Sequence, residues 1–222
     1  MFKRSAALLL VSSFGLLGAA CGGGEGKVVD QYFSALAAGD NQTLTSFAAV
    51  EFPEKVDSYK ILSATPENVE PAPLPELVKK AQDLQRELDA NTKEAKAYNL
   101  ANYEKLDQIK AAEKAGKAPA GGLAEVHKKW TDFNQKDRDL KKALYGAKAA
   151  VEKEKHLVSL SIGPNEEVEQ LTGSMKTKDV ELSLRIGGVD APYTMTLRKY
   201  ELQGGSQPRM SNRWFILRLA KK

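Results

Sequence analysis

Two hydrophobic periods divide the chain. Between about residues 76 and 156, apolar residues recur every three or four positions, which is the period of an α-helix. Later segments such as 180–186 alternate apolar and polar residues, which is the period of a strand with one polar face. Near the beginning, 27–38 has the helical period and 56–64 that of a strand. The pattern therefore predicts an early helix and strand, a long helical segment, and then a series of strands.

The segments that flank the helical block predict an antiparallel sheet with helices before it. Gly39 is expected to end the first helix, and Asp40 to cap a short second one. The alternation changes phase between Tyr193 and Tyr200, which predicts a β-bulge near Arg198. The last strand is apolar on both faces, so we expect either a second copy or the helical block to cover it. The later strands are expected at 157–162, 168–172, 180–186, 193–202 and 214–219.

The helical block, 76–156, predicts a long antiparallel hairpin. Its first helix is expected from Glu76 to about Ala115 and its second from Leu123, with Gly and Pro residues between them. Apolar residues of the second helix are three and four apart for four heptads, which indicates a coiled coil. A helix of about 40 residues is about 60 Å long, which exceeds the width of a small domain.

Folding this hairpin about Pro119 sets its expected register. Tyr98 then lies opposite Leu140, and Asn102 lies level with Asp137, the polar residue on the seam of the second helix. A buried polar pair fixes the register of a coiled coil at a cost in stability, and Asn102 with Asp137 is the candidate polar layer. The alternative is that Asp137 reaches water from a thin two-helix seam.

The N-terminal residues have the pattern of an export signal. Lys3 and Arg4 precede an apolar run of roughly 15 residues, which is shorter than a membrane-spanning helix. Small residues then precede Cys21, the single Cys of the chain. The segment resembles a bacterial lipoprotein signal with its lipobox, which implies that 1–20 are removed and that Cys21 becomes the lipid-modified first residue. The alternative is a plain secretory signal that leaves a free thiol.

The lipoprotein resemblance also implies an anchor and a location. Cys21 would carry a diacylglycerol and usually an N-acyl chain, and each buried methylene contributes about 0.8 kcal/mol to membrane binding. The Gly-rich residues 21–26 predict a flexible tether. Because Gly22 rather than Asp follows the Cys, the pattern resembles sorting to the outer membrane, facing the periplasm, if the host has two membranes. The expected location is the bacterial cell envelope.

Charge argues against a nucleic-acid partner. The chain has 33 Lys and Arg against 29 Asp and Glu, a formal net charge of +4, and loss of Lys3 and Arg4 leaves 31 against 29. Both signs are interleaved in 76–156, as on the solvated faces of a helical rod. Because an export signal also separates the chain from nucleic acid, we expect no nucleic-acid partner.

Side chains that carry chemistry are few. His127 and His156 both lie on the second predicted helix, about 43 Å apart at 1.5 Å per residue, so they cannot share a metal ion. The single Cys excludes a disulfide framework and a cysteine-rich zinc site. We therefore expect no catalytic residues, no metal ligands and no cofactor apart from the covalent lipid on Cys21.

Two segments resemble a known fold family. Segments 29–40 (VDQYFSALAAGD) and 213–217 (RWFIL) resemble the cystatin-like cone of the nuclear-transport-factor-2-like superfamily. The resemblance covers about half of the chain and implies a curved antiparallel sheet with N-terminal helices, formed by 27–65 and 157–222 and interrupted by the hairpin 76–156. Four aromatic residues would face the cone interior, as a ligand pocket or as core: Tyr32, Tyr59, Tyr193 and Trp214.

The leading functional hypothesis is a non-enzymatic, lipid-anchored envelope protein. Its hairpin would contact another envelope protein or a second copy of the chain, because a rod that projects tens of ångströms serves no core that the cone needs. The alternative is a carrier that binds a small molecule in the cone pocket. A third hypothesis, an enzyme of the cone superfamily, lacks suitably placed acid–base groups.

Overall fold

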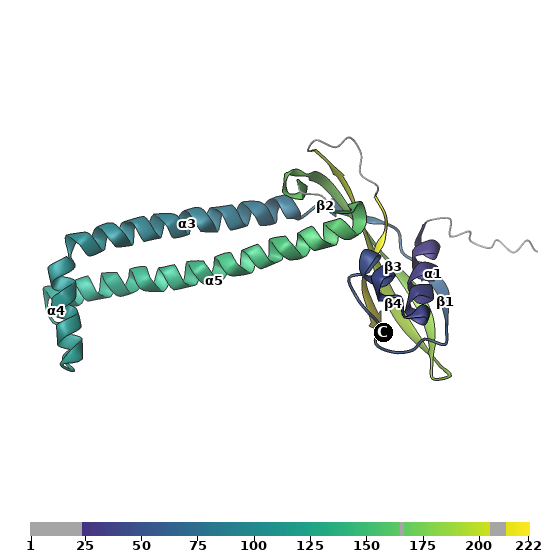
Figure 1. The fold of residues 1–222 in the computed structure, drawn as a ribbon, viewed down its shortest axis with the longest axis horizontal. Helices are drawn as coiled ribbons and strands as arrows, with labels where there is room; N and C mark the ends of the chain where they lie inside the picture. Colours follow the sequence, from purple (N-terminus) through teal and green to yellow (C-terminus); the bar gives the residue numbers. More distant parts are fainter. Residues whose placement is uncertain (1–23, 165–166, 205–211) are drawn as a thin grey trace, which may run out of the picture.

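The structure is a computed structural model that describes residues 24–164, 167–204 and 212–222. It confirms the α+β class and the antiparallel sheet. A sheet with helices against both faces forms one part, and a long helical projection forms the other (Figure 1). The predicted signal peptide, Cys21 and the first part of the tether lie outside the described residues.

The helices before the sheet, the long helical segment and the strands after it follow one another as predicted, but the predicted strand at 157–162 is helix and β2 was not predicted. The helices of the described residues are α1 (Glu25–Ala38), α2 (Asn41–Phe47), α3 (Leu74–Ala101), α4 (Tyr103–Lys114) and α5 (Gly122–Ile162). The strands are β1 (Ser58–Ala64), β2 (Asn68–Pro71), β3 (Thr172–Ile186), β4 (Val189–Gln203) and β5 (Phe215–Lys221). A 3-10 turn, Val168–Gln170, lies where a strand was expected.

We call the sheet, α1, α2 and the end of α5 from Val151 onward the body. The rod is α3, α4 and the part of α5 before Val151, and its distal end is the end farthest from the sheet (Figure 1). The 28 residues of α3 correspond to about 42 Å and the 41 residues of α5 to about 62 Å. The rod therefore projects well beyond the body.

The sheet has the order β1–β3–β4–β5, with β2 also paired to β3. β1 pairs with 180–185 of β3 and β2 with 174–177, so the two short strands follow each other along one edge of β3. All these pairings are antiparallel. The long hairpin of β3 and β4 is therefore the centre of the body.

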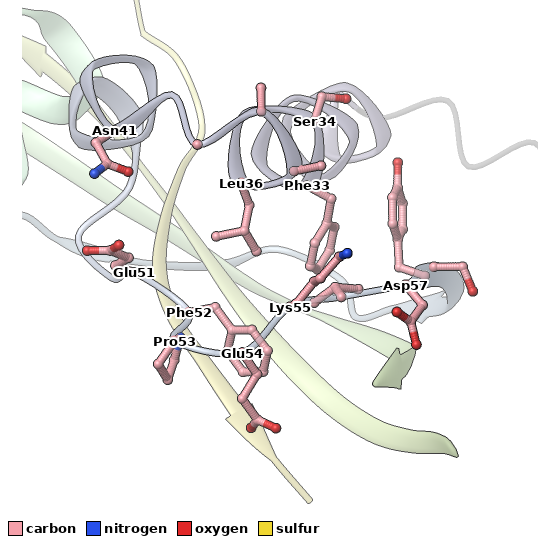
Figure 2. A pocket seen from close by; sticks show the side chains of 16 residues that line it. Phe33, Ser34, Leu36, Asn41, Glu51, Phe52, Pro53, Glu54, Lys55 and Asp57 are labelled. Carbon is pink, nitrogen blue, oxygen red and sulfur yellow. The ribbon is translucent and has the colours of Figure 1, made fainter. Parts of the chain in front are cut away.

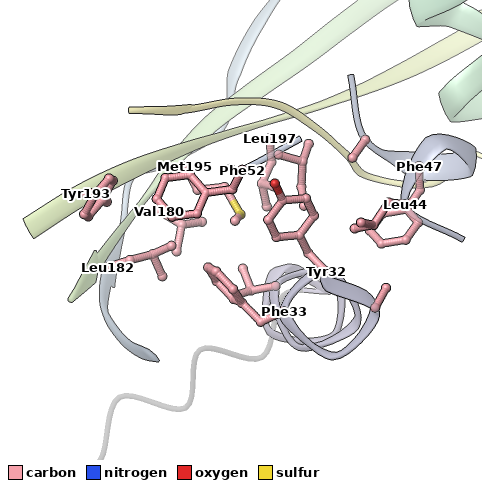
Figure 3. Close-up of a cluster of buried hydrophobic side chains, with 14 of the residues drawn as sticks. Tyr32, Phe33, Leu44, Phe47, Phe52, Val180, Leu182, Tyr193, Met195 and Leu197 are labelled. Atoms are coloured by element: carbon pink, nitrogen blue, oxygen red, sulfur yellow. The ribbon is translucent and has the colours of Figure 1, made fainter. Parts of the chain in front are cut away.

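The first hydrophobic core lies between one sheet face and α1 with α2. Figure 3 shows Tyr32 and Phe33 of α1 directed at Met195 and Leu197 of β4. The two helices are joined as predicted. Gly39 ends α1 with a positive φ of 67°, and the Asp40 carboxylate accepts a hydrogen bond from the backbone N–H of Thr43 at 3.0 Å.

A second core lies on the opposite sheet face, beneath the base of the rod. Met175 of β3 and Tyr200 of β4 pack there against Val158 near the end of α5. The last strand contributes to both cores, Phe215 to the second and Ile216 to the first. The prediction that this strand is covered on both sides is confirmed, and helices of the same chain provide the cover.

The change of phase before Tyr200 has a different cause from the one predicted. β3 and β4 pair without a slip, so no bulge interrupts β4 in that ladder. The irregularity lies in β5, whose pairing with β4 shifts between Thr196 and Leu197. Tyr200 faces away from Leu197 because the second core, rather than the first, needs an apolar residue at that end of the sheet.

The first helix of the rod is not continuous, contrary to the sequence prediction. α3 ends at Ala101, and α4 begins at Tyr103 and runs across the distal end (Figure 1). Between them, Asn102 leaves the helical conformation with φ −123° and ψ 20°, and its side-chain amide donates to the Tyr98 carbonyl at 3.0 Å. Asn competes in this way with helical backbone bonding, which explains the break.

The segment 157–162 is helix and not the predicted strand. α5 continues to Ile162, and Gly163 follows it. The segment is apolar nearly all round because it packs between the sheet and the beginning of α3, and such a run has no distinguishing period. One uninterrupted helix therefore passes from the rod into the body.

Candidate functional site

The predicted pocket residues lie mainly in the first core. Tyr32, Tyr193 and Trp214 are buried there. The Tyr32 hydroxyl donates to the Val50 carbonyl at 3.3 Å, and burial raises its pKa to about 12. The Tyr193 ring meets Phe52 edge to face. These three side chains therefore pack in the hydrophobic core and do not line an open pocket in the described part of the chain.

Tyr59 lies beside an open groove on the body, which we call the body groove. Its ring stacks on Phe33 with centroids 4.4 Å apart, and its hydroxyl donates to Asp30 at 2.7 Å. Burial and this bond to a carboxylate raise the pKa of Tyr59 to about 12. The groove runs between α1 and residues 51–58, has a volume of about 870 Å³, and is shown in Figure 2.

A buried ion pair fixes the beginning of α1 to the sheet. The Lys178 ammonium is 2.8 Å from the Glu25 carboxylate, and both side chains are less than one-tenth exposed. Lys178 and Lys199 both lie over the Trp214 ring, at 4.6 and 5.0 Å from its centroid. The hydrogen bond from Lys178 holds the pKa of Glu25 below its usual value. Glu25 and Gly26, which the sequence predicts to belong to the flexible tether, therefore form the first turn of α1, and the ion pair holds that turn against the sheet.

The rod has a groove of its own between α3 and α5. This rod groove has a volume of about 490 Å³ and lies near the distal end. It is lined on α3 by Asn91, Thr92, Ala95, Lys96, Asn99 and Leu100. It is lined on α5 by Trp130, Phe133, Asn134 and Asp137. Aromatic, small and polar side chains of both helices therefore meet in one place.

Asn91 is the buried polar residue of this seam, which the sequence analysis missed. It is 1% exposed, and its Nδ2 donates to the Phe133 carbonyl at 3.2 Å. Its Oδ1 is buried without a partner among the described residues. Asn91 lies three residues after Leu88 and four before Ala95. This heptad spacing places Asn91 on the seam, so the sequence pattern could have predicted its burial.

The predicted polar layer is formed differently. Asn102 lies at the junction of α3 and α4 and bonds to Tyr98, whereas Asp137 lines the rod groove and pairs with Lys141 at 2.8 Å. The register of α3 differs by about one heptad from the prediction, because Tyr98 contacts Phe133 rather than Leu140. The break at Asn102 removes α4 from the antiparallel pair and so moves α3 along α5.

Large apolar side chains are exposed on the rod. Leu100, at the rim of the rod groove, is 78% exposed, and Tyr103 at the start of α4 is 60% exposed. Tyr145 on α5 is also 78% exposed. It lies eleven residues after Asn134, about three helical turns, and therefore on the same side of α5 as this groove residue. Exposed apolar side chains that lie close together are typical of a protein interface, and Leu100 and Tyr103 are three residues apart at the distal end.

Groups for metal or acid–base chemistry are sparse in the described part of the chain. His127 lies 3.1 Å from Glu113 near the distal end, and His156 lines a small groove at the base of α5. Residues 24–164, 167–204 and 212–222 contain no cluster of three or more His, Cys, Asp or Glu side chains arranged for a metal ion. Within the same ranges, no helix has the length and apolar character needed to cross a membrane.

Comparison of the chain with protein-family models, with curated proteins and with solved structures yields no match. The features of the described residues that bear on function are the two grooves, the buried ion pair and the exposed face of the rod.

Proposed function

We propose that this chain is a lipid-anchored protein of the bacterial envelope whose rod docks onto another protein. The exposure of Leu100 and Tyr145 on the groove side of the rod is the observation that carries the proposal. Burying a Leu side chain contributes about 1.5–3 kcal/mol. A partner that covers Leu100 would therefore be bound more tightly by about this free energy. We also propose that the body belongs to the cystatin-like cone class, on the likeness of its helices-then-sheet order.

The position of the anchor supports a docking role. In the proposal, the lipid is attached to Cys21, three residues before Gly24 and four before Glu25, and the pair of Glu25 with Lys178 fixes the body there. The body is then held close to the lipid surface, since each extended residue spans at most about 3.6 Å. The rod, in contrast, extends far enough to meet proteins away from that surface.

Site-specific photocrosslinking in native envelopes tests the docking role. A photoreactive residue placed at Leu100 or Tyr145 is expected to form protein adducts. Matched positions are Val189, the exposed first residue of β4, and Glu94, which is exposed and lies about 160° around α3 from both Thr92 and Lys96 of the groove, and we expect no adducts there. Equal adduct formation at all four positions, or none at any, would contradict the proposal.

The lipid anchor has a separate test. The variant Cys21→Ala is expected to remain in the soluble fraction when its signal is removed by another peptidase, whereas the unchanged chain sediments with membranes. Sedimentation of a processed Cys21→Ala variant with membranes would exclude lipid anchoring at this residue.

The body groove favours one second candidate, a small-molecule carrier. Its volume of about 870 Å³ lies within the range of about 300–1,000 Å³ that is common for ligand pockets, and Phe33 and Phe52 give it apolar walls. Ser34→Trp would fill the groove from the exposed side of α1. Loss of binding of an anilinonaphthalene sulfonate probe in this variant would support the carrier, and unchanged binding would oppose it.

A further inference from the structure

The rod groove is incomplete as a seam between only two helices. Trp130 and Phe133 lie in it half-buried, and Leu100 stands at its rim almost fully exposed. In coiled coils with more helices, such residues are enclosed by a third or fourth helix. The exposed side of this seam therefore fits the face of another helix pair.

Asn91 gives an independent indication that something occupies this groove. Its Oδ1 is enclosed in the seam without a hydrogen-bond partner among residues of the described ranges. A buried acceptor that is left unpaired destabilises the structure that contains it. Asn91 also lines the rod groove, so an occupant that parts the seam enough to donate a hydrogen bond to this oxygen removes the cost, which apolar contact alone does not.

The charges at the rim are self-complementary. Lys96 of α3 and Asp137 of α5 line the same groove from its two sides, and Lys96 has no ion-pair partner among the described residues. In a pair related by a two-fold axis, each surface patch meets the same patch of the other copy. Lys96 of one copy then faces Asp137 of the other, twice. The charges on α3 are also balanced, with five basic and five acidic residues, so two copies of it do not repel.

We infer that the occupant is the rod of a second copy of this chain, the two hairpins packing side by side across their rod grooves. This inference rests on the proposed docking function and names its partner. Leu100 and Tyr145 of each copy enter the contact. The shared face is about 42 Å long and as wide as two helices of about 10 Å each. Its area is therefore on the order of the ~800 Å² per partner that stable interfaces bury.

Sedimentation of the purified, detergent-solubilised full chain over a range of concentrations tests this inference. The expected result is a monomer–dimer equilibrium that Leu100→Glu shifts toward monomer, with a dissociation constant raised about tenfold or more, since each 1.4 kcal/mol is a factor of ten. Helix content measured by circular dichroism verifies that each variant is folded.

A charge-reversal series makes the test specific. Lys96→Glu and Asp137→Lys alone are expected to weaken the dimer, and the double variant to restore most of its affinity. Glu94→Lys is the matched control, because it reverses a charge of the same size on the side of α3 that faces away from the groove. A dimer that none of the Leu100, Lys96 and Asp137 changes affects would overturn the inference.

The outcomes separate this inference from the function on which it rests. A chain that stays monomeric at every concentration overturns self-association. If position 100 then still forms adducts with a different protein in native envelopes, the docking function stands and only the identity of the partner is wrong. If it forms none, both fail.

Discussion

The buried pair of Glu25 and Lys178 yields a quantitative prediction. Glu25→Gln removes the carboxylate and leaves the ammonium of Lys178, which is less than one-tenth exposed, without its nearest partner. Removal of one member of a buried ion pair costs about 3–5 kcal/mol, because the other charge stays buried. Two features reduce this cost here. Glu67 lies 4.0 Å from Lys178, and the Trp214 ring lies 4.6 Å from it.

The cation–π contact between Lys178 and Trp214 remains in Glu25→Gln and contributes about 0.5–2 kcal/mol. We therefore expect this variant to lower the free energy of unfolding by about 2–3 kcal/mol. The double change of Glu25→Leu with Lys178→Met replaces both charges by apolar groups. It is expected to cost less than about 1 kcal/mol, since an apolar pair avoids the desolvation of two charges.

Urea unfolding at neutral pH, followed by tryptophan fluorescence, measures these differences. Glu113→Gln is the matched control, because its carboxylate pairs with His127 on the exposed surface of the rod. Exposed pairs contribute about 0–1 kcal/mol, so this variant should differ little from the unchanged chain. A loss below about 0.5 kcal/mol for Glu25→Gln, equal to the control, would refute the reasoning.

The same pair predicts the acid side of the stability profile. The hydrogen bond from Lys178 lowers the pKa of Glu25 in the folded chain below its usual value of 4.5. The contribution of a carboxyl group with a lowered pKa is complete above the unfolded pKa and is lost as the pH falls through the folded one. Stability should thus decline more steeply below pH 4.5 in the unchanged chain than in Glu25→Gln.

Two further variants test packing and hydrogen bonding in the body. Gly173→Ala should destabilise the chain by more than about 2 kcal/mol in urea unfolding, because its φ of 150° is strained for other residues and its Cβ would overlap the Glu201 carbonyl. Normal stability of this variant would contradict the tight β3–β4 contact. Tyr200→Phe should cost about 1–3 kcal/mol, because buried Glu154 loses the hydroxyl that donates to it. Tyr145→Phe, on the surface, should change stability by less than about 0.5 kcal/mol.

Local patterns predicted the parts of the fold that local interactions determine. Gly39 and Asp40 each act within one helical turn, so their capping roles were evident from neighbouring residues. The alternation at 180–186 reflects a sheet with one face buried and the other polar at this end of β3. Such an alternation can be recognised from the segment's own residues. The two-sided apolar strand at Phe215 was likewise evident, since two cores impose two apolar faces on it.

Long-range contacts determine the features that the sequence did not reveal. Glu25 and Lys178 are 153 residues apart, and nothing near either residue indicates the other. The sequence of 157–162 predicts a strand because burial against the sheet removes the helical period from the end of α5. The break at Asn102 moved the register of the rod, and with it the polar position that is buried, from Asn102 to Asn91.

The continuity of α5 makes the rod a lever. The helix extends without a break from the distal end to the second core, where Glu154 bonds to Tyr200 and Ser161 accepts the backbone N–H of Tyr200. A rotation of about 10° at Glu154, about 48 Å from the distal end of α5, displaces that end by about 8 Å. Conversely, a force applied at the distal end arrives at the sheet as a torque on these few bonds. Engagement of the rod and strain in the body are therefore mechanically linked.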